Sequence, residues 1–582
     1  MIIITSEQNK KDFSKEIRST SKEVLYLGQW CKSLDDKDFF INQNIIDYHW
    51  CDYNKREKDL KYIENLYEKI LINLTKILND FHGTSLERSE AEIFYGLWLK
   101  TYLIVAFDRW EIIDNLLKKN IKFDLYQKKI DRFKFHNADE FIFNSIQSDD
   151  WNDFYFQKIL GFRLNKFVNI KYFDHKREVN FISSKRSNSK KNIFKLLDFI
   201  FHKIFRYKKN INFSYLDINN IDYLKLILKI KNFSSFDKEL NANPSMSYDY
   251  NIRKKLSINI KNENDFERFI FKNIFLDIPT TYIENFTNIH NFISKFLVQK
   301  NNLFLTTHGY ANREEFQLLV SLSKKKYKSK LYIIQHGSGA IPKYNTELNF
   351  SEKISDKFLR SGINKFNISN HKPFGQIFYE KLKYNKSSKN ITLLLSGLPR
   401  RTLYMRSIPL SSGLKDYFSE QINLIKLIKN NIYKNFYIKF YPTNYWNEKN
   451  YFLNNFKDLK YYEMNSKIKN ISEKTKLFIN TSTFTPHNQL ISSDIPCIFF
   501  WDRKKWLLTS DDEHFHQNVL LNKIYFESST EVAKFINKNY DNIFDWWYSK
   551  EIRDIVKEYQ NRYAYPIDKK SKKIFNFLKA LN

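Results

Sequence analysis

The stretch LFLTTHGYANREEFQLLVSLSKKKYKSKLYIIQHGSG, residues 303–339, decides the fold. Its apolar runs 303–306 and 331–334 are typical of buried strands, and the segment 313–325 between them has the apolar spacing of a helix. A strand, a helix and a second strand of these lengths form a unit whose two strands are parallel. The sequence therefore predicts an α/β fold with a parallel sheet.

The same alternation restarts after the polar stretch YNKSSKN (384–390), which we interpret as a linker. The strands expected beyond it are 391–395, 436–440, 477–479 and 497–500, and the helices are 417–429, 466–475 and 487–493. The sequence thus predicts two α/β domains, each with a parallel sheet, joined by one linker. They cover residues 1–383 and 391–545, and helices follow over 546–582.

The N-terminal part is more helical. Short apolar runs at 24–27 and 45–48 are predicted as strands, and the apolar spacing over 55–81 and 90–117 predicts helices. Residues 120–265 have no clear period, and we interpret them as a helix-rich insertion with an exposed basic loop at 184–191. Whether this insertion binds an acceptor or only enlarges the domain stays open.

The composition excludes global disorder, because 42% of the 582 residues are hydrophobic and 17% are aromatic. There are 96 Lys and Arg against 65 Asp and Glu, and 96 − 65 gives a net charge of +31. Such a charge suits an anionic partner: nucleic acid, a phospholipid surface or a nucleotide-activated substrate. The alternative is a bias toward Lys and Asn that runs through the whole sequence and serves no function.

Cysteine usage and hydropathy bear on location. Cys31, Cys51 and Cys497 are too scattered for a disulfide framework or a zinc site, which favours a reducing compartment and no structural metal. The first residues lack the pattern of a signal peptide, and no apolar run approaches the roughly 18 residues that span a bilayer. We therefore expect a cytoplasmic protein that touches a membrane, if at all, from its surface.

Two His-Gly pairs follow consecutive strands of the first expected sheet. Ligands of open parallel sheets bind beyond the carboxyl ends of strands, so both pairs are expected at one rim. A single histidine there is more often a packed or solvated residue, but two such pairs favour a function for the second histidine. If the early strands join the same sheet, Gln29, Trp30, His49, Trp50 and Asp52 are expected at the same rim. The candidates are His308, Gly309, His336, Gly337, Gln29, Trp30, His49 and Asp52.

A hydroxyl cluster, NTST (480–483), follows the expected strand 477–479 and precedes a helix. Hydroxyls and free backbone amides at a helix start favour phosphate, whereas an ordinary N-cap needs a single hydroxyl. Segments 396–401 and 439–442 end neighbouring strands and are expected to share that ligand. The donor-site candidates are Gly397, Arg400, Lys439, Tyr441, Thr481, Ser482 and Thr483.

Several motifs are missing from the sequence. It contains no GxxxxGK[ST] loop, no GxGxxG after a strand and no GxSxG elbow. An Asp-x-Asp that could bind a metal at a diphosphate is not evident either. We therefore expect a transfer that needs no metal and no cofactor.

Seven segments resemble a family of large transferases encoded in bacterial O-antigen and surface-polysaccharide loci. They are VLYLGQWC (24–31), DYHW (47–50), FDRWE (107–111), QHGSG (335–339), KISDKFLRSG (353–362), KFYP (439–442) and NTST with ISSDIPCIFFWD (480–483 and 491–502). The resemblance covers nearly the whole chain, least at 120–260. It implies an α/β fold of the GT-B kind, in which two Rossmann-type domains face each other across a cleft. It also implies a glycosyltransferase with the acceptor on the N-terminal domain and the activated donor on the C-terminal one.

The donor segments are also similar to those of CMP-ulosonic-acid transferases, which have Lys-x-His-Pro and paired Ser or Thr motifs. Tyr441 stands where those enzymes have His, so the donor class stays open. Gln489 stands where the related pattern has a Glu that binds the sugar or ribose of the donor. An amide can hydrogen-bond a hydroxyl but carries no charge.

Together these features predict a glycosyltransferase that moves a sugar from a nucleotide-sugar donor to a glycan or lipid-linked glycan at the inner face of the plasma membrane. Ser482, Thr483 and Lys439 would stabilise the leaving phosphate. His336 would bind that phosphate or transfer a proton, and Asp52 or His49 would be the acceptor base. Whether the reaction inverts or retains configuration stays open.

Two other functions remain as alternatives. A polyol-phosphate transferase of the teichoic-acid type would use the same fold, and a nucleic-acid-binding protein would explain the net charge but not the residues at the strand ends. Asp108 and Arg109 lie inside an apolar helix and are predicted to form a buried ion pair that holds the fold, rather than a catalytic pair.

Overall fold

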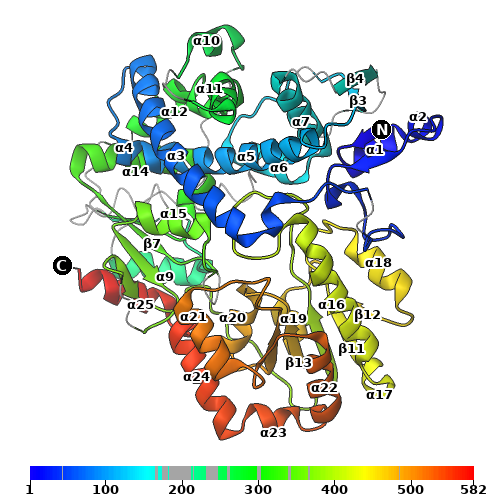
Figure 1. Ribbon diagram of the computed structural model, residues 1–582. Helices are drawn as coiled ribbons and strands as arrows, with labels where there is room; N and C mark the ends of the chain where they lie inside the picture. The colour runs from blue at the N-terminus through cyan, green and yellow to red at the C-terminus, as the bar shows by residue number, and fades with distance from the viewer. Residues whose placement is uncertain are drawn as a thin grey trace.

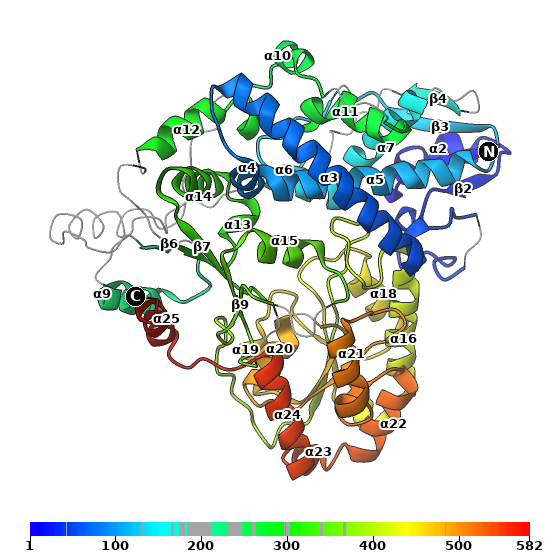
Figure 2. The same cartoon turned by 60° about the vertical axis from the view of Figure 1, so that its left-hand side comes forward.

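The computed structural model describes residues 1–581 except 42–43, 131, 164–167, 174–177, 179–180, 183–210, 214, 231–246, 259–262, 296, 298–302, 338–341, 365–367 and 484. The basic loop expected at 184–191 lies outside the described residues. The described strands form three sheets, and all their pairings are parallel (Figures 1 and 2).

The first sheet contains β1 (Ile2–Ile4), β2 (Val24–Tyr26), β3 (Phe123–Lys128) and β4 (Val168–Phe173), in the order β2-β1-β3-β4. The sequence predicts one sheet over residues 1–383, but these strands pair only with one another. The segment 45–48 is not a strand, because only Ile45 forms a bridge, to Tyr26, before the chain turns at 49–51.

Helices between these strands build the core of the N-terminal part. They are α1 (Glu7–Asp12), α2 (Ser14–Arg18), α3 (Tyr53–His82), α4 (Arg88–Ala91), α5 (Leu97–Leu117), α6 (Ala138–Gln147) and α7 (Asp149–Arg163). Helix α5 is buried nearly all round, and its Leu103 and Ile104 share one apolar core with Leu66 of α3 and Ile3 of β1. The apolar spacing that predicts helices at 55–81 and 90–117 thus reflects burial.

The second sheet has the order β5-β6-β7-β8-β9. Its strands are β5 (Ile211–Phe213), β6 (Leu303–Thr306), β7 (Lys330–Ile334), β8 (Lys357–Arg360) and β9 (His371–Pro373). Its helices are α9 (Asn220–Ile230), α13 (Gly309–Asn312), α14 (Glu314–Tyr327) and α15 (Thr346–Ile354), while α10 (Tyr250–Lys255), α11 (Asp265–Asp277) and α12 (Phe286–Ser294) lie beside α3 (Figure 2). The segment 120–265 is therefore more than a helical insertion, because it supplies strands β3, β4 and β5.

The third sheet has the order β12-β11-β10-β13-β14-β15. Its strands are β10 (Asn390–Leu394), β11 (Phe436–Lys439), β12 (Lys460–Tyr462), β13 (Thr475–Asn480), β14 (Cys497–Phe500) and β15 (Tyr525–Phe526). Numbered from β10, this is the order 3-2-1-4-5-6 of a Rossmann fold, whose strand order reverses between β10 and β13. Its helices include α16 (Leu414–Leu427), α17 (Asn430–Tyr433), α18 (Glu448–Asn455), α19 (Ile468–Ser472), α20 (Thr485–Ser492), α21 (Ser510–Phe515), α22 (Ser529–Asn539) and α23 (Ile543–Trp547).

The C-terminal helices link the two halves. Helix α24 (Lys550–Tyr563) packs on the third-sheet unit, whereas α25 (Lys570–Lys579) returns to the second sheet beside α9 (Figure 2). Ile574 and Leu578 of α25 share a small apolar core with Leu226 of α9 and Leu305 of β6. The tail thus connects the two Rossmann-type units a second time. Among the described residues, every helix is too short or too polar to cross a membrane.

A loop after β10 is anchored in the N-terminal part. Its Leu403 and Met405 belong to the N-terminal apolar core. Arg109 donates a hydrogen bond to the carbonyl of Thr402 at 3.0 Å and forms a buried ion pair with Asp108 at 2.6 Å. The prediction that Asp108 and Arg109 form a buried structural pair is therefore confirmed, and this pair also fixes the loop.

Candidate active site

A cavity of about 620 Å³ lies between the second and third sheets. On the second-sheet side its wall includes His336 and Gly337, which follow β7. On the other side it includes Gly397 after β10, Tyr441 after β11 and Thr485 at the start of α20. Because the strand order reverses between β10 and β13, this is the place where a doubly wound sheet binds its ligand.

The two units approach each other closely at Gly337. This residue has a φ of +65°, and a Cβ atom built on it would lie 2.5 Å from Oγ1 of Thr485. A larger residue would meet both backbone strain and a clash, so glycine is needed here. Gly397 has a similar role within the third-sheet unit, because the ring of Tyr441 occupies the space of its missing side chain.

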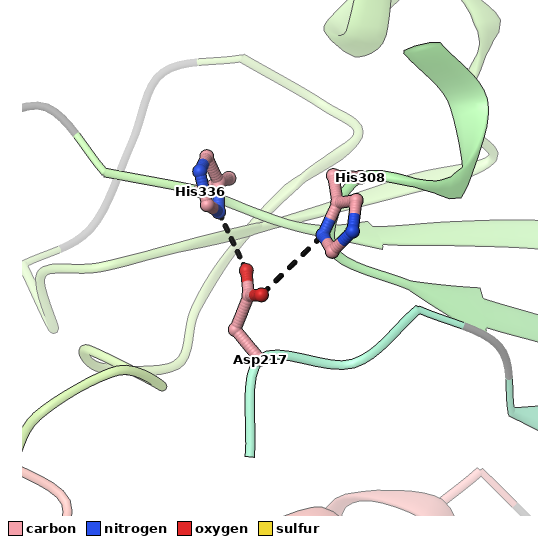
Figure 3. A group of neighbouring side chains, drawn as sticks. All are labelled: Asp217, His308 and His336. Carbon is pink, nitrogen blue, oxygen red and sulfur yellow. Dashed lines mark hydrogen bonds and ion pairs between the residues drawn. The ribbon is translucent and has the colours of Figure 1, made fainter. Parts of the chain in front are cut away.

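Three side chains meet at the rim of the second sheet (Figure 3). His336 Nδ1 lies 2.5 Å from Oδ2 of Asp217, and His308 Nδ1 lies 3.4 Å from Oδ1 of the same carboxylate. Asp217 comes from the segment between β5 and α9, whereas the histidines follow β7 and β6. The His336 side chain is 54% exposed. The predicted pairing of the two histidines at one rim is thus found, with a carboxylate between them.

The hydrogen bond to Asp217 raises the pKa of His336, although partial burial opposes this rise. Burial alone would raise the pKa of Asp217, but hydrogen bonds and charge from the two imidazoles bring it below its usual value. An Nδ1–H that donates to the carboxylate leaves Nε2 of His336 as the acceptor. His336 therefore has the geometry of an oriented general base.

The same three groups have a second chemical capacity. One ligand atom from each of Asp217, His308 and His336 lies within 4.8 Å of the others. Two imidazole nitrogens and a carboxylate oxygen are ligands that Zn²⁺ accepts. The cluster thus has donors for a cation, although the sequence predicts no metal site.

On the donor side the hydroxyls of NTST divide into two kinds. Thr481 Oγ1 donates to the carbonyl of Leu394 at 2.8 Å and lies 2.7 Å from the hydroxyl of Tyr417, so it ties strands together. Thr483 Oγ1 is buried and has no hydrogen-bond partner among the described residues, and Ser482 beside it is also buried. Both precede α20. Thr485 and Pro486 of its first turn line the cavity, whereas Ser482 and Thr483 are not part of its wall.

The cations expected near phosphate are engaged elsewhere. Lys439 Nζ donates to the carbonyls of Phe440 at 2.8 Å and Met464 at 2.5 Å, and burial lowers its pKa. Arg400 pairs with Glu7. Neither side chain lines the 620 Å³ cavity. The prediction that Lys439 neutralises phosphate is therefore wrong, because backbone carbonyls hold its ammonium group. Arg401, which does line the cavity, pairs with Asp149 at 2.6 Å.

The candidates near the first sheet do not reach the cavity, because β1 to β4 form a sheet of their own. Gln29 is buried and donates to the carbonyl of Phe39, and Trp30 is buried and donates to the carbonyl of Thr5. His49 is buried too, which lowers its pKa well below the usual value.

The prediction that Asp52 is the acceptor base is also wrong, because Asp52 does not line the cavity. Its carboxylate caps α3 and accepts from the backbone amide of Asn54 at 2.8 Å. Gly309 begins α13 and donates its amide to Thr306 Oγ1, so it shapes a turn. Gln489 lies half-buried on α20 and is not part of the cavity wall.

Asp217 is the member of this cluster that the sequence does not predict. It follows a strand of three residues, in a segment without a clear period. The only available signal is a carboxylate placed shortly after an apolar run, INF, and such a run is too short to be told from chance.

The chain matches the sequence model of the LIC12162 family of transferases over residues 7–578. It belongs to the LIC12162 transferase family. The match includes strands of all three sheets and every residue of the cavity wall, so this LIC12162-family protein is a transferase. No curated protein sequence matches it.

Solved structures similar to the LIC12162-family chain include MurG of Acinetobacter baumannii, with 9% identity, a TM-score of 0.33, and coverage of 64% of this chain and 100% of that one. TarM has 11% identity and a TM-score of 0.33, covering 51% and 58%. The spinosyn rhamnosyltransferase SpnG complexed with thymidine diphosphate has 8% identity and a TM-score of 0.29, covering 51% and 78%. The parallel sheets, and not these low scores, define the fold as two facing Rossmann-type units of the GT-B kind. The strand order 3-2-1-4-5-6 belongs to the third sheet, whereas the second sheet has its strands in chain order.

Proposed function

We propose that this transferase moves a sugar from a nucleotide-activated donor to a bacterial surface polysaccharide acceptor, of the O-antigen or capsule type, without a metal. The observation that carries the proposal is the cavity between the units, with His336 on one wall and the start of α20 on the other. A base on one face and an anion-binding helix end on the other are what transfer from a phosphate leaving group needs.

The donor lies against the third-sheet unit in this proposal. Negative charge builds on the leaving phosphate as the glycosidic bond breaks, and the amides at the start of α20 and Thr483 Oγ1 stabilise it. Thr483 suits this role because its hydroxyl is buried without a partner in the described structure. A nucleoside mono- or diphosphate fits this role, and CMP is one of them.

The acceptor hydroxyl approaches from the second-sheet side. Nε2 of His336 takes its proton while Asp217 stabilises the imidazolium. Direct attack by an activated hydroxyl displaces the phosphate from the opposite face, so the product has inverted anomeric configuration. A lipid-linked glycan as acceptor, at the cytoplasmic face of the membrane, is part of the proposal, since the net charge of +31 suits an anionic surface.

Thermal-shift screening against CMP, CDP, UDP, GDP and ADP tests the donor site. A ligand that binds only the folded state stabilises it by about 2.7 kcal/mol at a hundred times its Kd. We expect one nucleotide to raise Tm, and Thr483→Ala to reduce this shift. Thr530→Ala, an exposed threonine on α22, is the matched control and should leave the shift unchanged.

No shift with any nucleotide, in a protein that melts cooperatively, would contradict the donor site. Mass analysis of the product then separates sugar transfer from transfer of a polyol phosphate, because only the second leaves a phosphodiester in the product. Tight, steeply salt-dependent binding of DNA or RNA without nucleotide binding would favour the nucleic-acid alternative.

A further inference from the structure

Helix α9 carries an apolar stripe on its exposed face. Ile221, Leu224 and Leu228 are 64%, 40% and 60% exposed, whereas Leu226 and Ile227 on the other face are buried. At about 100° per residue, the three exposed side chains share one face of the helix. Single exposed apolar residues are common, but three aligned on one helix face mark a contact surface.

Basic side chains border this stripe. Lys225 and Lys229 are exposed and lie along one edge of it, because each follows an exposed leucine by one residue. The neighbouring helix α25 adds exposed Lys572 and Lys579, and Leu581 just beyond it is exposed as well. Figure 2 shows α9 and α25 side by side, away from the third-sheet unit. An apolar stripe edged by lysines is the pattern of a helix that lies in the interface of an anionic bilayer.

The stripe also begins next to the candidate active site. Ile221 is four residues from Asp217, whose carboxylate contacts His336 and His308. A bilayer in contact with α9 would therefore lie beside the rim from which we expect the acceptor to enter. A soluble acceptor needs no such arrangement, but a glycan on a lipid carrier does.

We propose that the α9 stripe (Ile221, Leu224 and Leu228, with Lys225 and Lys229) docks the protein on an anionic lipid bilayer and so presents a lipid-linked acceptor to His336. The inference rests on the proposed function for the acceptor, but the docking itself does not. Apolar side chains enter the acyl boundary while the lysines pair with anionic headgroups.

Co-sedimentation with vesicles tests the docking directly. The full chain should bind phosphatidylcholine vesicles that contain about one third phosphatidylglycerol, and bind pure phosphatidylcholine vesicles about tenfold or more weakly. Ile221→Ser/Leu228→Ser should lower the partition coefficient on anionic vesicles at least about tenfold. Lys225→Gln/Lys229→Gln should lower it by a similar factor and make binding less sensitive to salt.

Ile72→Ser is the matched control, because Ile72 is 56% exposed and belongs to α3, far from α9 in the sequence. The nucleotide-induced Tm shift of each variant shows whether it is folded and whether the donor site is intact, independently of docking. Absent binding to anionic vesicles, or binding that Ile221→Ser/Leu228→Ser leaves unchanged, would overturn the proposal. Concentration-dependent dimerisation lost in that variant would assign the stripe to a second copy instead, and also overturn it.

Discussion

His336 Nδ1 lies 2.5 Å from Asp217 Oδ2, and this hydrogen bond joins residues 119 positions apart in the chain. The bond fixes the orientation of the imidazole and stabilises its charged form, so in the proposed mechanism the carboxylate acts on the reaction through the histidine. Because the two residues follow different strands of one sheet, their meeting is a product of the topology.

Removing the carboxylate charge should change the pH dependence of transfer. The base must be neutral, so kcat/KM rises with pH through the pKa of His336, which Asp217 raises. In Asp217→Asn the imidazolium loses this stabilisation, and we expect the acidic limb of the profile to move to lower pH. Loss of orientation should lower the plateau about 10- to 100-fold. Asp568→Asn, an exposed control, should change neither the position of the acidic limb nor the plateau. If Asp217→Asn leaves the acidic limb in place, Asp217 does not act through His336.

Metal dependence gives a second prediction. In the proposed mechanism EDTA leaves the activity unchanged, whereas Zn²⁺ inhibits because Asp217, His308 and His336 together can hold it and occupy the base. His308→Ala should weaken the inhibition and retain measurable transfer, since His308 is not the base. Activity that EDTA abolishes and a divalent cation restores would show that the transfer is metal-dependent after all.

The close contact between the two units at Gly337 gives a third prediction. Gly337→Ala places a Cβ 2.5 Å from Thr485 Oγ1 at a residue with a φ of +65°. We expect at least tenfold weaker nucleotide binding, measured by titration, because the start of α20 is displaced. Thr485→Ala in the same chain removes the nearest atom and should restore part of the affinity. Gly413→Ala, where the nearest atom is 3.8 Å away, should bind normally.

The sequence predicts the two C-terminal Rossmann-type units well, because β6, β7, β10 and β14 are apolar runs with a helix between them. In the first sheet it predicts β2, at 24–27, but misses β1, which has three residues, and β3, which is interrupted by polar residues. It also misses β5 of the second sheet, which has three residues. Strands so short give no period. The expectation of one N-terminal sheet follows from this failure.

The sequence predicts only part of the candidate site, because it locates strand ends but not the contacts that orient side chains. His336, Gly337, Gly397 and Tyr441 follow well-marked strands, and all of them line the cavity. The end of a predicted strand shows that a residue lies at the rim of the sheet, but it does not show in which direction the side chain points. Lys439 ends β11, yet its ammonium is held by carbonyls outside the cavity. Which polar group faces a ligand depends on contacts that only tertiary structure supplies.

The ion pair of Asp108 and Arg109 predicts a large loss of stability when one partner is removed. Asp108→Ala leaves a buried guanidinium without its carboxylate, so we expect the free energy of unfolding to fall by about 3–5 kcal/mol in urea titration. Asp265→Ala, which breaks an exposed pair with Arg268, should cost less than about 1 kcal/mol. Equal losses would mean that the buried pair has no special role.

The buried carboxyl group of Asp153 should make the free energy of unfolding depend on pH. The residue is buried on α7, accepts a hydrogen bond from Ser6 at 2.9 Å, and burial, with Asp149 nearby, raises its pKa to about 8. In the unfolded chain an aspartate has a pKa near 3.9. The folded state therefore keeps a proton that the unfolded state releases, so stability is full below pH 4 and falls as pH rises toward 8. The slope from this group approaches about 1.4 kcal/mol per pH unit.

Asp153→Asn has no proton to lose and keeps an oxygen that can accept from Ser6. Its stability relative to the wild-type chain should therefore rise steadily from pH 5 to pH 8, measured as the difference in the free energy of unfolding at each pH. Asp568→Asn, an exposed substitution of the same kind, should show a constant difference over that range. A constant difference for Asp153→Asn as well would mean that the buried carboxylate is ionised in the folded state, stabilised by the charge of Arg401 and the hydrogen bond from Ser6.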